Sequence, residues 1–102
     1  MIVLHIVNKS PFEKNSLETC LRLSSAGSSI LLIEDGVYGA LAGGEMAGTI
    51  RDALADRTVC VLGPDLLARG IDPGRLIDGV EIVDYAAFVK LAVEQPKVQS
   101  WL

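Results

Sequence analysis

The stretch Ile2-Val3-Leu4-His5-Ile6-Val7 is short, β-branched and largely apolar on both faces. A strand with this pattern is buried on both sides, as in a parallel sheet covered by helices. Three further runs of the same kind follow, at residues 30–33, 58–62 and 80–83. The sequence therefore predicts four short strands that lie in one sheet.

Helical patterns separate these strands. Asn15 and Glu18 have the spacing of a capping box, which predicts a helix that begins near Ser16 and ends at Gly27. We expect its core face to carry Leu17, Cys20, Leu21 and Ser24. A second helical region has core spacing at Met46, Ile50, Ala53 and Leu54.

The second half of the chain continues the alternation. Residues 65–69 predict about one helical turn, and residues 71–79 a loop. Asp84 is a good N-cap for a last helix, which Pro96 ends and which leaves a tail ending in Trp101-Leu102. We expect the core face of this helix to carry Tyr85, Phe88, Val89 and Ala92.

Strands that alternate with helices predict an α/β fold. With 102 residues, we expect one domain over residues 1–102. Its architecture would be a three-layer αβα arrangement around a small parallel sheet, with Rossmann-like or flavodoxin-like topology.

The composition restricts the partners of the chain. Half of the residues are hydrophobic, which is rich for a small soluble monomer and predicts that other subunits cover part of the surface. The net charge of −4 and the lack of a Lys or Arg run argue against direct nucleic-acid binding. No stretch approaches the roughly 20 apolar residues of a membrane span, and the apolar start is too short for a signal peptide. We therefore expect a cytoplasmic protein with reduced cysteines.

The predicted carboxyl ends of the strands are mostly acidic, which disfavours an anionic ligand such as a nucleotide. The glycines at positions 39, 43, 44 and 48 fit neither the dinucleotide fingerprint nor the P-loop. Glu34 and Asp35 could hold Mg²⁺ as in a receiver domain, but no lysine follows the fourth strand, and a capped turn at Asp35-Gly36 is the favoured interpretation. We expect no cofactor and no metal.

Cys20 and Cys60 are separated by forty positions, a spacing that favours neither zinc binding nor thioredoxin-like exchange. Cys60 lies between valines and is expected to be a small buried hydrophobe. Cys20 is the candidate catalytic, sulfur-carrying residue, with a structural role as the alternative. His5, the only histidine, is either a core residue or the base that activates Cys20. Trp101 either folds back on its own sheet or anchors a neighbouring subunit.

Several segments together resemble the DsrH/TusB family of sulfur-relay subunits. They are residues 4–11, residues 33–37 with Ala40, the Asp-Leu-x-Ala-Arg-Gly pattern at residues 65–70, and the closing pattern from Asp84-Tyr85 to Trp101-Leu102. Their order and spacing agree with the family over nearly the whole chain.

The resemblance implies a subunit of a cytoplasmic DsrEFH/TusBCD-type heterohexamer, with two copies each of this chain and of DsrE/TusD-like and DsrF/TusC-like partners. Such complexes pass persulfide sulfur to a DsrC/TusE-like carrier, and the indispensable cysteine of the family belongs to the DsrE/TusD-type partner. The subunit resembled is chiefly architectural, so we expect no enzyme activity from this chain alone.

The branch of the family depends on Cys20, because the DsrH type resembles this chain in having a cysteine in this helix. The expected role is therefore the oxidation of intracellular sulfur. The alternatives are a TusB-type subunit for 2-thiouridine synthesis at the tRNA wobble position and an independent sulfurtransferase that uses Cys20.

Overall fold

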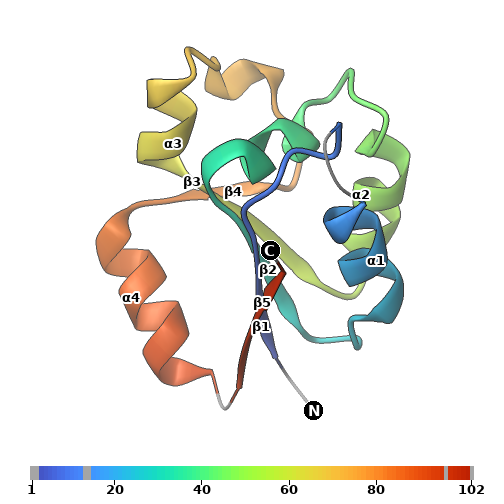
Figure 1. Cartoon of the computed structure of the whole chain (residues 1–102), viewed down its shortest axis with the longest axis vertical. Helices are drawn as coiled ribbons and strands as arrows, with labels where there is room; N and C mark the ends of the chain where they lie inside the picture. Colours follow the sequence, from blue (N-terminus) through green and yellow to red (C-terminus); the bar gives the residue numbers. More distant parts are fainter. Residues whose placement is uncertain (1–2, 13–14, 96, 102) are drawn as a thin grey trace.

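The computed structural model describes residues 3–12, 15–95 and 97–101. Five strands form one parallel sheet in the order β4-β3-β2-β1-β5 (Figure 1). This arrangement confirms the predicted α/β fold with a small parallel sheet. The strands are β1 (Leu4–Val7), β2 (Ser29–Leu32), β3 (Thr58–Leu62), β4 (Glu81–Val83) and β5 (Val98–Trp101).

Within the described residues, four α-helices and two 3-10 helices connect the strands. They are α1 (Ser16–Leu23), η1 (Glu34–Ala40), α2 (Ala47–Ala53), α3 (Gly63–Ala68), η2 (Pro73–Arg75) and α4 (Tyr85–Glu94). The Asp84 side chain accepts a hydrogen bond from the Ala87 N–H at 2.8 Å, which confirms its predicted role as an N-cap. α1 begins where the sequence predicts, but Asn15 makes no side-chain capping bond and the helix ends before Gly27.

The strand order decides which face each helix covers. β1, β2, β3 and β4 follow one another across the sheet in one direction, whereas the connection through α4 returns to the opposite edge, where β5 lies. Right-handed crossovers that advance in opposite directions place their helices on opposite faces. Figure 1 shows α1 and α2 on one side of the sheet and α4 on the other. We name these sides the α1–α2 face and the α4 face.

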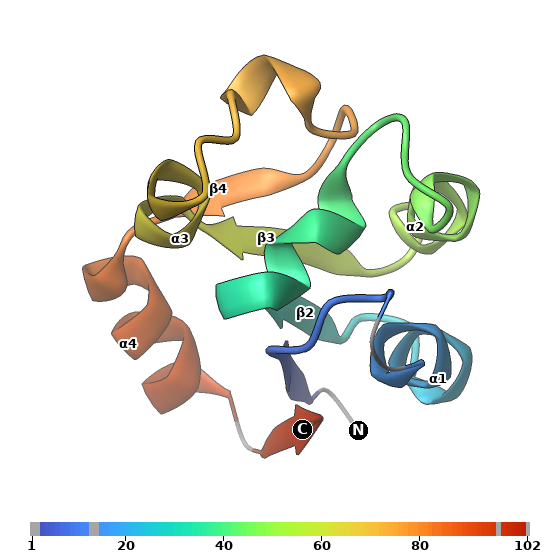
Figure 2. The same cartoon turned by 45° about the horizontal axis from the view of Figure 1, so that its top comes forward.

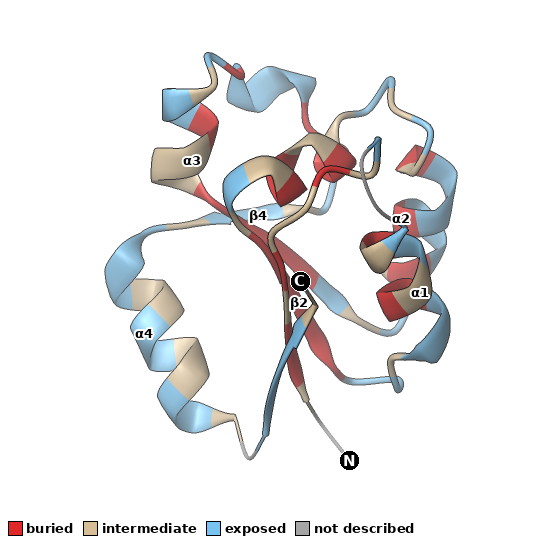
Figure 3. Cartoon of the chain, in the orientation of Figure 1, coloured by how far each residue is buried: buried red, intermediate tan, exposed pale blue. Residues whose placement is uncertain are grey.

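The two faces carry two separate sets of buried side chains (Figure 3). The larger set lies on the α1–α2 face and includes Leu17, Cys20 and Leu21 of α1, together with Leu66 of α3. The buried hydrophobic cluster of the α4 face has only three members in the described chain, and partly buried side chains of α4 pack against them. The three are Leu4, Leu31 and Cys60.

Of two predictions for the end of the chain, one is wrong and the other is confirmed only for Phe88 and Ala92. Residues 98–101 form β5, an edge strand that pairs in parallel with β1, where the sequence predicted a tail. In α4 the sheet-facing residues are Phe88, Leu91 and Ala92, whereas Tyr85 and Val89 are exposed. This helix is apolar around nearly its whole circumference, so periodicity could not select the buried side. In the described part of the chain, no helix is long and apolar enough to cross a membrane.

Candidate functional site

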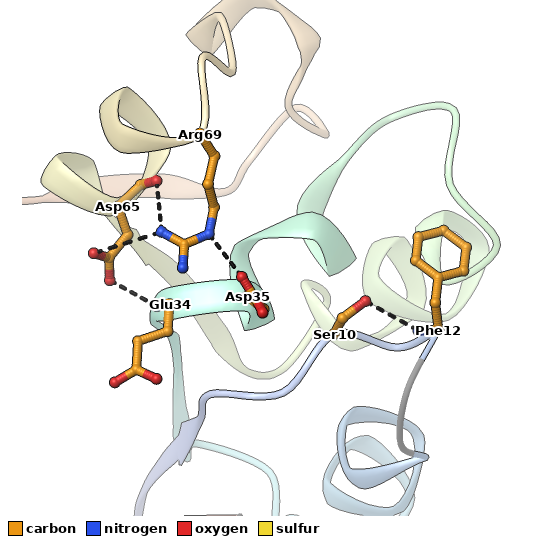
Figure 4. A network of polar contacts seen from close by, with 6 residues as sticks. All are labelled: Ser10, Phe12, Glu34, Asp35, Asp65 and Arg69. Atoms are coloured by element: carbon orange, nitrogen blue, oxygen red, sulfur yellow. Dashed lines mark hydrogen bonds and ion pairs between the residues drawn. The ribbon is translucent and has the colours of Figure 1, made fainter.

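The carboxyl edge of the sheet carries a polar network that joins η1 to α3 (Figures 2 and 4). The Arg69 guanidinium donates to Asp35 Oδ1 at 2.9 Å and to the carbonyl of Asp65 at 3.2 Å. Asp65 Oδ2 in turn accepts the backbone N–H of Glu34 at 2.6 Å. Arg69 and Asp65 lie one turn apart on the α3 segment, so a single short helix supplies both side chains.

The start of η1 is held in an uncommon backbone conformation. Glu34 has φ of 49°, in the left-handed region, and its N–H is the one that Asp65 binds. Two residues later the chain passes so close to β1 that a Cβ at Gly36 would collide with the carbonyl oxygen of Val7. Only glycine fits there, and η1 is thereby fixed against the end of the first strand.

These contacts assign the acidic side chains to structural roles. Asp35 is paired with Arg69, and Asp65 accepts the backbone N–H of Glu34 at the start of η1. Over residues 3–12, 15–95 and 97–101, no group of three or more His, Cys, Asp or Glu side chains could hold a metal ion. The capped turn expected at Asp35-Gly36 is instead the start of a 3-10 helix, in which Asp35 pairs with Arg69.

Cys20 lies on α1 in the interior of the α1–α2 face and is fully buried. Burial raises the pKa of its thiol to about 12, although the nearby Arg57 guanidinium acts in the opposite direction. Arg57 donates hydrogen bonds to the Leu21 carbonyl and to Ser24 Oγ, so its charge is already used to hold the end of α1. A neutral, inaccessible thiol is a poor nucleophile, and the sulfur-carrying role of Cys20 stays a prediction.

Cys60 lies on the α4 face and is also buried, as the sequence predicts. Burial, together with the nearby Glu81 carboxylate, raises the pKa of its thiol to about 11. The two cysteines lie on opposite faces of the sheet, so they cannot act together as a redox pair.

His5 meets Trp101 and not Cys20. The indole Nε1–H of Trp101 donates to His5 Nδ1 at 3.0 Å, and Trp101 packs against the core of the α1–α2 face. The end of the chain therefore folds back on its own sheet, which confirms the first of the two interpretations of Trp101. Because the partner of His5 comes from a strand that the sequence analysis missed, this contact could not be predicted.

The most exposed apolar side chains of α4 form a row that we name the outer stripe. Tyr85, Val89 and Val93 are spaced four residues apart and are 58%, 60% and 78% exposed. Residues at this spacing lie one above the other on a single side of a helix. The outer stripe points away from the sheet, because the opposite side of α4 supplies Phe88, Leu91 and Ala92.

Comparisons with known proteins identify the family. The family described as DsrH-like protein matches residues 9–98. The chain belongs to the DsrH-like family. Protein TusB of Pectobacterium parmentieri is 38% identical over 100 residues, covering 97% of the DsrH-like chain and all of the relative. Protein TusB of Escherichia coli K12 is 34% identical over 99 residues, covering 97% of the chain and the whole relative.

Solved structures agree on the fold. The ychN protein of Escherichia coli superposes on the DsrH-like chain with a TM-score of 0.83 over 98% of both chains, at 24% identity. A protein of unknown function from Methanobacterium thermoautotrophicum gives a TM-score of 0.72 over 97% of this chain and 96% of its own, at 20% identity. These structures confirm the fold, whereas the family model and the TusB relatives confirm membership of the DsrH/TusB family of sulfur-relay subunits. Membership implies association with TusC- and TusD-type subunits.

Proposed function

We propose that the chain is a TusB-type subunit of a cytoplasmic sulfur relay that serves 2-thiolation of the wobble uridine in tRNA. In this proposal it holds TusC- and TusD-type subunits in place and does not carry sulfur itself. One observation supports this role above all: both thiols are buried, whereas a row of apolar side chains on α4 is exposed.

Sulfur transfer between proteins needs a thiolate that can reach the outer sulfur of a persulfide. Cys20 meets neither condition, since its side chain has no exposed surface and its raised pKa keeps the thiol protonated at neutral pH. The working cysteine would therefore belong to the TusD-type subunit. We infer a heterohexamer with two copies of each subunit, which delivers sulfur to a TusE-type carrier.

The outer stripe is the part of this chain that we assign to contacts with a related subunit. Tyr85, Val89 and Val93 expose a row of large apolar side chains, and tyrosine is enriched at interface hot spots. Lys90 and Glu94 are exposed on the same helix and form an ion pair at 3.9 Å. An apolar row with charged neighbours has the composition of an interface core and its rim.

The oxidation of intracellular sulfur, which the presence of Cys20 led us to expect, is not confirmed. The curated relatives carry the name TusB, and the cysteine on which the other branch depended is buried. Both observations support the thiolation branch.

The branch is tested in a strain that lacks the gene. We expect mass spectrometry of hydrolysed tRNA to show loss of 2-thiouridine derivatives, and expression of the wild-type chain to restore them. Cys20→Ser and Cys20→Ala should restore them as well, provided that immunoblotting shows normal amounts of each variant. Unchanged 2-thiouridine together with impaired consumption of stored sulfur would instead establish the oxidation branch.

An independent sulfurtransferase would behave differently in vitro. After incubation of the native chain with a persulfide donor, we expect intact-mass spectrometry to show no gain of one sulfur atom. A gain that disappears in Cys20→Ser would overturn the scaffold assignment and support sulfur transfer by this chain alone.

A further inference from the structure

β5 depends on one side chain for its attachment to the core. Val98, Gln99 and Ser100 are exposed, and only Trp101 packs against the buried set of the α1–α2 face. β5 lies at the sheet edge, so its backbone pairs with β1 alone. The contact between Trp101 and His5 is therefore the main side-chain tie between this strand and the rest of the molecule.

That tie fixes the protonation state of His5. The indole N–H can donate to Nδ1 only while this nitrogen keeps a lone pair, so the ring is neutral with its proton on Nε2. The centroids of the two rings lie 6.1 Å apart and the ring planes are inclined by 44°. The rings are therefore not stacked, and stacking does not replace the hydrogen bond when it is lost. A protonated ring would present an N–H to the indole N–H, and two donors cannot bond each other.

Among the residues that the structure describes, none stabilises a charged His5. Only 7% of the surface of His5 is exposed. Its Nε2 atom has no hydrogen-bond partner among the described residues. Its neighbours in the sheet, Ile30 on β2 and Gln99 on β5, are both neutral. Neither side of the ring therefore offers a carboxylate as counter-ion.

The other described ionisable groups on this side of the sheet lie on α1 and in the adjoining loops. Glu18 and Arg22 of α1 are exposed, Cys20 is protonated, and Arg57 binds the end of α1. Lys9 follows β1 and Lys97 precedes β5, and a lysine side chain cannot act as a counter-ion for a charged imidazole. Burial alone lowers the pKa of His5 from its ordinary value of 6.5, with no contribution from any of these charges.

We propose that His5 and Trp101 form a pH-dependent clasp, which holds β5 on the sheet while His5 is neutral and releases Trp101 when His5 binds a proton. Release would also free the polypeptide that follows α4, because β5 is the next element along the chain. The clasp is closed at neutral pH and opens on acidification.

The chain contains one tryptophan and one histidine, so each signal has a single source. We would titrate the full-length chain from pH 8 to pH 5 and follow the indole N–H and imidazole resonances by NMR, with tryptophan emission in parallel. The expected result is a red shift of the emission and a shift of the indole resonance with the same midpoint as His5, below pH 6.5. Far-UV circular dichroism should keep most of its amplitude through this transition.

Two variants separate the clasp from a general effect of acid. His5→Asn offers an amide oxygen near the position of Nδ1 and cannot titrate, so the indole signals should stay constant over the same pH range. Trp101→Phe keeps a ring but removes the donor, so the midpoint of His5 should rise. A flat indole signal while His5 titrates, or the same transition in His5→Asn, would overturn the proposal. A His5 that stays neutral until the whole chain unfolds would overturn it too.

Discussion

The two faces of the sheet differ in how completely they are covered. On the α1–α2 face, α1, α2 and the segments that connect the strands bury a set of seventeen described residues. On the α4 face a single helix buries three, and no residue of that helix is itself buried. Figure 3 shows this difference as red segments that concentrate on one side of the sheet. A well-buried face stabilises the fold, whereas a thinly covered face is available to a partner.

The difference follows from the direction of the crossovers. The connections through α1 and α2 advance across the sheet and place both helices on one face, whereas the connection through α4 returns and places its helix on the other (Figure 1). The helices match this division. α1 alternates apolar and charged residues, as a surface helix of a monomer does, whereas Lys90 and Glu94 are the only charged residues in α4. A helix with so few polar residues is typical of one covered on both sides.

The largest expected effect separates the two faces at adjacent residues of β2. Leu32 lies on the α1–α2 face and Leu31 on the α4 face, and both are 0% exposed. We expect Leu32→Ala to lower the free energy of unfolding by about 4–5 kcal/mol and Leu31→Ala by about 2–3 kcal/mol. The single helix over Leu31 can move into the space, whereas the closely packed opposite face cannot.

Urea denaturation of both variants measures this difference. Equal losses would show that α4 is held as rigidly as α1 and α2, and would break the comparison. As a control for two-state unfolding, the slope of the unfolding free energy against urea concentration should be the same in both variants and the wild type.

The next effect concerns the outer stripe. Replacing Val89 and Val93 together by Lys should leave the free energy of unfolding nearly unchanged, because both side chains are exposed. Binding to the TusC- and TusD-type subunits should weaken at least about tenfold, or roughly 1.4 kcal/mol, which co-purification and isothermal titration calorimetry would measure. The matched control is the pair Leu23→Lys and Leu67→Lys, on α1 and α3, which should bind normally. Weaker binding in the control alone would move the interface to α1 or α3.

The two buried cysteines report on how often each face opens. In the native chain we expect Cys60, under α4, to react with a thiol reagent about tenfold faster than Cys20. The variants Cys20→Ala and Cys60→Ala leave one thiol each, so that mass spectrometry can follow the rates separately. Faster labelling of Cys20 would mean that α1, and not α4, is the more mobile cover.

A smaller effect is expected at alkaline pH. Both thiols have a higher pKa in the folded chain than the ordinary 9.0, so the unfolded chain loses these protons first as the pH rises. The stability that they contribute is complete below pH 9 and declines as the pH rises towards 11 and 12. Urea midpoints between pH 8 and pH 11 should fall more steeply in the wild type than in Cys20→Ala. Parallel curves would show that the Cys20 thiol ionises equally well in both states.

The sequence predicted the central strands because they are apolar on both faces, a pattern with few alternatives. Residues 30–33 and 58–62 were expected, and the observed strands are Ser29–Leu32 and Thr58–Leu62. The buried side of α1 was also predicted, since Glu18 and Arg22 mark its opposite side. Periodicity identifies the buried side of a helix only where polar residues occupy its other side.

The edges could not be predicted for the converse reason. β5 reads Val98-Gln99-Ser100-Trp101, too polar and too short to distinguish from a tail. α4 has apolar residues on every side, so its orientation depends on strand order, which is not encoded locally. The contact between His5 and Trp101 joins residues 96 positions apart and follows only from that order. The clamp of Asp35 by Arg69 likewise needs η1 and α3 to be placed side by side.

The pairing of β1 with β5 has a kinetic consequence. Closing a contact over 96 positions costs more chain entropy than the local β1-α1-β2 and β2-α2-β3 units do, so those units are expected to assemble first. Strand β5 would then dock last, onto a nucleus that already exists. In a stopped-flow refolding experiment, the indole fluorescence would therefore report the final step, whereas circular dichroism would record the earlier formation of secondary structure.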